Sequence, residues 1–340
     1  MFAFTVVALI YLCFELILVL GLNIQYGLTG ILNLAYIIFY AIGAYIAGIL
    51  TGPPSSIGLT HIGGYELPFY VGIAGAMGAA GVLAVVVGAF TLGRRLRASY
   101  LAVGTLVIAV VALQVVSQDL ALFNGQLGLL DVPQPFGRGM SGNGFSGLYC
   151  VILICIVIAL YVVCERLRRS PFGRMLRAIR DDEIATQVFG YAIFRMKLKA
   201  FVFGGVISGL AGCLTMFYIG SFSPAGWSVY EVIFALTCIF VGGAGNNLGV
   251  VVGTIIVEIV FVQLTSLVPT LQSNPELVQL VRAGAIGLVL ILTLRFRPQG
   301  LIPERPEQMA PDGPALGALR IRPLSALSRP AGTSRREKQI

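Results

Sequence analysis

Charged residues are scarce in this chain of 340 residues. Asp, Glu, Lys and Arg together make up 11% of it, less than half of the quarter that is usual in soluble domains. The hydrophobic share is 57%, and 42 glycines add to the apolar total. A single water-soluble globule is therefore excluded. A coiled coil, a collagen-like fibre and a disordered charged polymer are excluded by the same composition.

Histidine is almost absent, since His61 is the only one. A HExxH zinc site or a histidine-based catalytic triad therefore cannot be built. The six cysteines lie in or beside apolar runs without a CxxC pair, which is typical of small buried hydrophobes rather than of a disulfide or metal framework. No phosphate-binding G-x-x-x-x-G-K-[ST] motif occurs. We expect no catalytic residue, no cofactor and no metal.

Long apolar runs are what the chain has in abundance. Each run is long enough, or nearly so, to cross a bilayer as a helix. Small residues at four-residue spacing, such as Gly204, Ser208 and Gly212, predict faces on which helices approach closely. We predict an all-α, polytopic membrane protein with about nine transmembrane helices, near residues 2–22, 31–50, 68–92, 100–122, 146–164, 200–219, 229–244, 248–268 and 277–294.

The positions of the cations predict the orientation. With the N-terminus outside, every Lys and Arg except Arg138 and Arg282 falls in an inner loop or in the C-terminal tail. Positively charged loops stay in the cytoplasm, so we predict an N-out, C-in topology. The net charge of +8 thus has a topological cause, and nucleic-acid binding is not expected. The inner segments are residues 23–30, 93–99, 165–199, 242–247 and 295–340.

Two parts of the chain differ from the apolar spans. We predict a transmembrane domain over residues 1–300 and a disordered cytoplasmic tail over 301–340, which is rich in Pro, Ala, Arg and Ser. The inner loop 165–199 has the sequence of two short helices. Ser170 and Pro171 are suited to start the first, and Gly190 is suited to end the second. A solvated loop along the headgroups and a docking surface for a soluble partner both fit this loop.

Ionisable residues inside the spans are costly in lipid and therefore informative. Glu258 and Arg282 lie on consecutive spans, which favours a buried ion pair; a substrate or proton site is the alternative. Ser228 and Glu231 have the spacing of a helix capping box, so Glu231 is expected to bond backbone N–H groups. Glu15 has no evident partner.

The loop from Ser170 to Ala185, SPFGRMLRAIRDDEIA, resembles the cytoplasmic loop of the permease subunits of bacterial branched-chain amino acid ABC importers, the LivM type in particular. The resemblance extends over most of the chain. It includes GLNIQYGLTG at residues 21–30, GGAG at 242–245 and FRPQGL at 296–301. The glycine pairs alone would be a weak signal, and the loop is the specific part.

This resemblance implies an ABC importer permease fold in the bacterial inner membrane. It implies as partners two ATP-binding subunits, a second related permease and a periplasmic solute-binding protein, with branched-chain amino acids or similar small polar solutes as cargo. The loop would then be the segment that couples to the ATPase. The residues that it assigns to this coupling are Asp181, Asp182, Glu183, Ala185 and Gly190.

The chain departs from the family pattern at two places. Residues 184–186 read Ile-Ala-Thr where the family has its EAA-type sequence, and residues 34–36 read Leu-Ala-Tyr where many relatives have a small residue and a histidine. Uncharged polar residues beside glycines predict a broken helix that lines the translocation path. These candidate path residues are Asn23, Gln25, Thr29 and Asn33.

Two other classes of function are alternatives to the importer. An ion-coupled secondary carrier or channel would work without an ATPase and would use Glu15 or Glu258 as its ion site. An intramembrane enzyme would need an acid, a base and a nucleophile, and the sequence has no recognisable set of these.

Overall fold

The computed structural model describes residues 2–53, 64–93, 98–135, 142–259, 275–297 and 299–304. Helices dominate this part of the chain. Its only β-type pairing is an antiparallel bridge between Leu129 and Phe222. The helices are α1 (Phe2–Thr29), α2 (Tyr36–Thr51), α3 (Phe69–Leu92), α4 (Ala98–Gln118), α5 (Leu120–Phe123), α6 (Gly142–Arg169), α7 (Pro171–Asp181), α8 (Glu183–Val188), α9 (Ile193–Ile219), η1 (Pro224–Gly226), α10 (Val229–Gly242), α11 (Asn247–Val257) and α14 (Pro275–Phe296).

Each predicted apolar run overlaps at least one of these helices, and residues 260–268 of the run 248–268 lie outside the described part. Among the described residues, six helical segments are long and apolar enough to cross a membrane: Phe4–Thr29, Phe69–Leu92, Ser99–Gln118, Gly144–Arg169, Ile193–Ile219 and Pro224–Gly242. Three apolar helices are shorter, namely Tyr36–Thr51, Asn247–Val257 and Gly284–Phe296. The all-α, polytopic class is therefore confirmed, while the number of nine spans and the N-out orientation stay predictions.

Helix α9 lies at the centre of the packing and contacts α1, α2 and α3. Glycines make this close contact possible. The Cα of Gly209 would lie 2.6 Å from a Cβ placed on Gly43, and the Ala84 Cβ would lie 2.7 Å from one placed on Gly205. Any larger side chain at these points would meet a neighbouring backbone or methyl group. The small residues of α9 thus form the packing face that their spacing predicts.

A second group of helices contains α10, α11 and α14. The chain reverses between α10 and α11 through Gly243 and Gly245, whose φ angles of 115° and 83° favour glycine. Residues 242–245 therefore form a tight turn between the two helices. Residues after α14 pack onto it, since Leu301 N donates to Val241 O at 2.9 Å and Ile302 N to Gly242 O at 3.0 Å.

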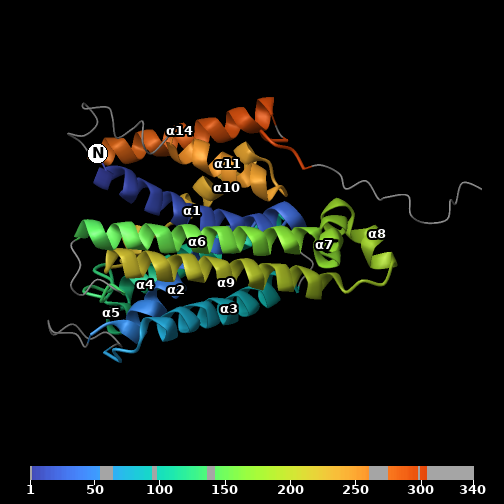
Figure 1. Cartoon of the computed structure of the whole chain (residues 1–340). Coiled ribbons are helices and arrows are strands. Elements are labelled where there is room, and N and C mark those ends of the chain that lie inside the picture. Colours follow the sequence, from blue (N-terminus) through green and yellow to red (C-terminus); the bar gives the residue numbers. More distant parts are fainter. Residues whose placement is uncertain are drawn as a thin grey trace, which may run out of the picture. The chain divides into compact units, whose positions relative to one another are not determined.

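Ordered packing thus continues to Glu304, four residues beyond the predicted end of the transmembrane domain. Of the tail predicted to be disordered, residues 301–304 are described and ordered, while residues 305–340 lie outside the described part, as do Arg94, Arg95 and Arg97. Figure 1 shows α7 and α8 at one end of the long helices and α5 at the other. The two ends are called the α7 end and the α5 end below.

Candidate functional site

A cavity of about 800 Å³ lies between α1, α2, α9, α10 and α14. One stripe of α1 forms a wall, because its lining residues recur every three or four positions and so share a helix face. Thr215 and Ile219 of α9 form another part of the wall. The lining residues of α1 are Phe4, Val7, Ala8, Tyr11, Phe14, Glu15 and Leu18.

Three carboxylates line this cavity, namely Glu15, Glu231 and Glu258. Glu258 is only 7% exposed, and the Oε1 atom of Glu15 is buried without a hydrogen-bond partner among the described residues. The predicted capping box is wrong in its Ser228 half, because Ser228 precedes α10 but its side chain makes no capping hydrogen bond. Glu231 lines the cavity, and its bonding to backbone N–H groups stays a prediction.

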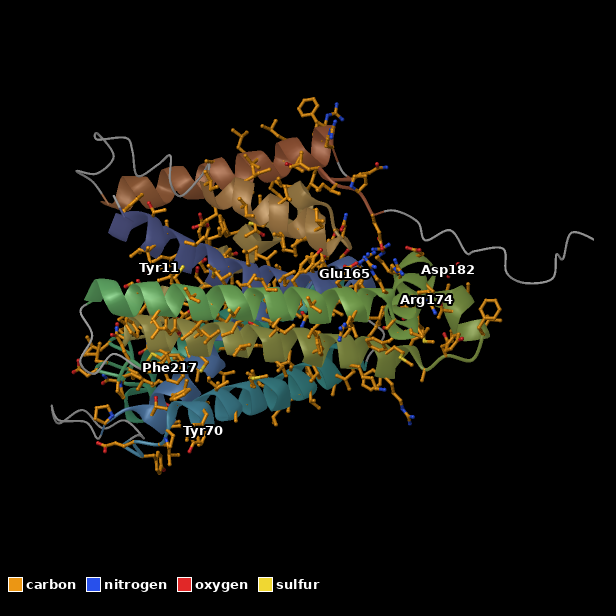
Figure 2. All side chains as sticks on the ribbon, viewed as in Figure 1. Tyr11, Tyr70, Glu165, Arg174, Asp182 and Phe217 are labelled. Carbon is orange, nitrogen blue, oxygen red and sulfur yellow. The ribbon has the colours of Figure 1, made fainter. Side chains whose placement is uncertain are left out.

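One rim of the cavity is held by the only β bridge in the described residues. Leu129 N donates to Phe222 O, and Phe222 N donates to Leu129 O, both at 2.9 Å. Leu127, Leu130 and Phe222 then face the cavity from this rim. Figure 2 shows Tyr11 of the cavity wall toward the α5 end, away from Glu165 and Asp182 at the α7 end.

The four predicted path residues lie in a buried group. Asn33 Nδ2 donates to Gln25 Oε1 at 2.9 Å, Gln25 Nε2 donates to Phe201 O at 2.6 Å, and the Thr29 hydroxyl donates to Gln25 O. Asn23, Gln25 and Asn33 line none of the described cavities, while Thr29 borders a second cavity of about 730 Å³ at the α7 end. Every residue of α1 from Gly21 to Gln25 is buried, so a packed layer separates the two cavities along α1.

Asn23 belongs to a hydrogen-bond network that joins three helices. Its Nδ2 donates to Asn247 Oδ1 at 2.9 Å, and Asn247 Nδ2 donates to Glu165 Oε2 at 3.1 Å. Arg168 and Arg169 bond the same Glu165 carboxylate at 2.7 and 2.6 Å. The network ties α1 to α11 and to the end of α6, close to the start of the loop 165–199.

The predicted ion pair of Glu258 with Arg282 stays a prediction. Glu258 ends α11 and lies in the cavity wall. Arg282 belongs to α14, but its side chain lies outside the described part.

The two short helices predicted for the loop 165–199 are confirmed as α7 and α8. Ser170 Oγ accepts from Gly173 N at 3.2 Å with Pro171 as the first helical residue, and Gly190 follows α8 with a φ of +83°. Leu176 and Ile179 of α7 are buried. The loop is thus anchored by an apolar face and by its own caps.

The acidic residues assigned to coupling have different partners. Asp182 caps α8, since its Oδ1 accepts from Ile184 N and Ala185 N at 2.9 Å each. Glu183 pairs with Lys197 Nζ at 2.5 Å, and Asp181 pairs with Arg180 Nε at 3.3 Å. Ala185 is exposed. The three acids therefore shape the loop, and the structure does not bring them together as one acidic site.

The loop exposes hydrophobic side chains. Ile184, Val188 and Phe189 are 77%, 81% and 80% exposed; these three residues are called the α8 tip. Phe189 and Ala185 also border a hollow of about 500 Å³ between α7 and α8. The coupling residues predicted from the sequence do not include the α8 tip. The spacing of Ile184 and Val188, one helical turn apart, is the sequence signal that could have indicated it.

These features define a class of protein. A bundle of apolar helices long enough to cross a membrane, with a carboxylate-lined cavity between them, is a polytopic membrane protein. The chain belongs to the family described as branched-chain amino acid transport system / permease component, which matches residues 1–294.

Individual relatives agree with this family. The high-affinity branched-chain amino acid transport system permease protein LivM of Escherichia coli (strain K12) is 32% identical over 329 residues, covering 89% of this chain and 71% of the relative. The probable LivM of Methanocaldococcus jannaschii is 29% identical over 237 residues, or 67% of each chain. The ribose import permease RbsC of Bacillus subtilis is 28% identical over 159 residues, 46% of this chain and 49% of the relative. No solved structure matches.

The family places this chain among the permease components of ABC importers, as a translocating subunit and not an enzyme. ATP hydrolysis belongs to separate subunits of such a transport system. The chain is accordingly a multi-pass membrane protein that works with other subunits.

Proposed function

We propose that this chain is the membrane subunit through which an ATP-driven importer moves branched-chain amino acids, or similar small polar solutes, across the bacterial inner membrane. The family membership and the names of the relatives support this cargo. The exposed α8 tip carries the proposal, because hydrophobic side chains this exposed at a helix end are suited to a protein partner.

The proposed partners are two ATP-binding subunits, a second related permease, a periplasmic solute-binding protein and the lipid bilayer. The ATP-binding subunit docks on α7 and α8. In this proposal Ile184, Val188 and Phe189 provide the contact area, while Asp182 and Glu183 hold α8 in the docking geometry. Exposed apolar side chains of the kind found on α3 and α4 face lipid or the second permease.

The cavity of 800 Å³ is proposed as the outer part of the translocation path. Val7, Leu18 and Phe234 offer apolar surface to a branched side chain, and the carboxyl groups that line the cavity offer oxygen acceptors to an ammonium group. The predicted path residues Asn23, Gln25, Thr29 and Asn33, in this scheme, close the path toward the α7 end. Closure of the ATPases would shift α7 and thereby loosen the packed layer between the two cavities.

The decisive experiment is uptake by the assembled complex in proteoliposomes. Leucine, isoleucine and valine should accumulate inside only when ATP, both permeases and the solute-binding protein are present. A complex with a hydrolysis-deficient ATPase is the control for passive leakage. Uptake by this chain alone, driven by a proton or sodium gradient and lost in Glu15→Gln or Glu258→Gln, would instead favour the secondary carrier.

A further inference from the structure

Glu304 joins the loop 165–199 to the last described residues of the chain. Its Oε1 accepts from Arg177 Nη1 at 3.2 Å, and its Oε2 accepts from Arg180 Nη2 at 2.8 Å. Both arginines lie on α7 one helical turn apart, so one carboxylate holds one face of that helix. The three side chains are mostly buried, at 12% exposed for Arg177, 27% for Arg180 and 17% for Glu304.

Arg180 extends this contact to the transmembrane helices. Its Nη1 donates to the carbonyl oxygen of Gly27, near the end of α1. Burial disfavours the charged form of Arg180, but the hydrogen bond and charge of Glu304, together with Asp181, outweigh it and raise the pKa of the guanidinium. The guanidinium therefore stays charged and can hold both partners at once.

The backbone that carries Glu304 is itself fixed. Leu301 and Ile302 bond to the end of α10, and Asn246 Nδ2 donates to Ile302 O at 3.3 Å. Gly245 lies against Glu304, since a Cβ placed on it would come within 2.7 Å of Glu304 Oε2. The segment 300–304, here called the strap, thus connects α7 to the turn between α10 and α11.

We propose that Glu304 is a positioning residue that joins α7 to the α10–α11 turn and, through Arg180, to α1, so that a movement of the loop 165–199 moves these helices. The inference rests on the proposed function, in which that loop receives the motion of an ATP-binding subunit. The α8 tip makes the contact with the partner, and the strap passes its displacement on. Leu176 and Ile179 keep α7 folded through buried apolar contacts, so breaking the ion pairs uncouples α7 without unfolding it.

The test measures uptake per ATP hydrolysed in the complete complex in proteoliposomes. Glu304→Lys places a third positive charge between Arg177 and Arg180 and should release the strap. Uptake per ATP should fall at least about fivefold, the lower range of a typical coupling between sites. The ATP-binding subunits should still co-purify, because the α8 tip is unchanged. Glu66→Lys, an exposed carboxylate before α3, is the matched control and should leave the ratio unchanged.

Rescue separates positioning from general damage. Arg177→Glu combined with Glu304→Lys restores an opposite-charge pair across the same contact and should recover most of the lost uptake per ATP. A wild-type ratio in Glu304→Lys, or a double variant no better than the single one, overturns the positioning role.

A second variant and the wild-type complex provide two further outcomes. Where Glu304→Lys lowers the yield of folded complex, Glu304→Gln removes the charge at constant size, and a wild-type ratio in that variant also overturns the proposal. Absence of ATP-driven uptake in the wild-type complex would instead refute the proposed function, which is a distinguishable failure.

Discussion

Truncating the α8 tip should weaken the binding of the ATP-binding subunit. Ile184, Val188 and Phe189 are each 77–81% exposed, so nearly all of their apolar surface is still available to a partner. Full burial of such a side chain contributes about 1.5–3 kcal/mol. Phe189→Ala should therefore cost roughly 2 kcal/mol of binding free energy, or about 30-fold in Kd. None of these side chains packs in the core, so the fold should be unaffected.

The assay is a titration of the purified ATP-binding subunit against the chain in nanodiscs, with Kd measured for the wild type and for each variant. Ile158→Ala is the matched control, because Ile158 is 57% exposed on α6 within a membrane span. Its Kd should equal that of the wild type. A Kd for Phe189→Ala and Ile184→Ala that stays within about twofold of wild type would refute the reasoning that docking is hydrophobic at this helix.

Three further predictions concern a cap, a packing face and the cavity. Asp182→Ala should destabilise α8 by about 1 kcal/mol and lower substrate-stimulated ATP hydrolysis. Asp182→Asn keeps an N-cap acceptor and should retain wild-type hydrolysis. An equal loss of hydrolysis in both variants would show that the charge, and not the cap, matters. A Cβ placed on Gly209 overlaps the Ala80 Cβ and lies 3.2 Å from Ala76 O. Gly209→Val should therefore lower the melting temperature, with an overpacking cost of about 1–3 kcal/mol, whereas Gly78→Val, with open space around it, should leave it unchanged. Thr215→Trp fills the cavity and should abolish uptake with the ATPase still bound; normal uptake would exclude the cavity from the path.

Much of the architecture followed from the sequence because lipid imposes simple rules. A helix must satisfy its own backbone and present apolar side chains, so the apolar runs marked the helices. Caps and turns are equally local. Ser170 with Pro171, and the glycines at 243 and 245, could be recognised because their backbone requirements depend on a few adjacent residues.

The candidate site was less predictable because its members are distant in sequence. Ser228 and Glu231 have the spacing of a capping box, yet the Ser228 side chain makes no capping bond and Glu231 lines the cavity. Asp181, Asp182 and Glu183 are adjacent in the sequence and carry the same charge, but in the structure each bonds a different partner. Their roles depend on backbone positions that no local pattern specifies.

By itself, the sequence determined that this protein lies in a lipid bilayer, that it is helical, which family it resembles, and that its basic loop contains two short helices. Tertiary structure alone decided which polar groups meet: Glu304 with α7, Asn23 with Asn247, and three carboxylates around one cavity. The physical reason is that the free energy of placing a helix in lipid is roughly a sum over its own residues, so it can be judged from a local stretch of sequence. A hydrogen bond or ion pair needs two groups within about 3 Å, and only the packing of helices distant in sequence brings them there.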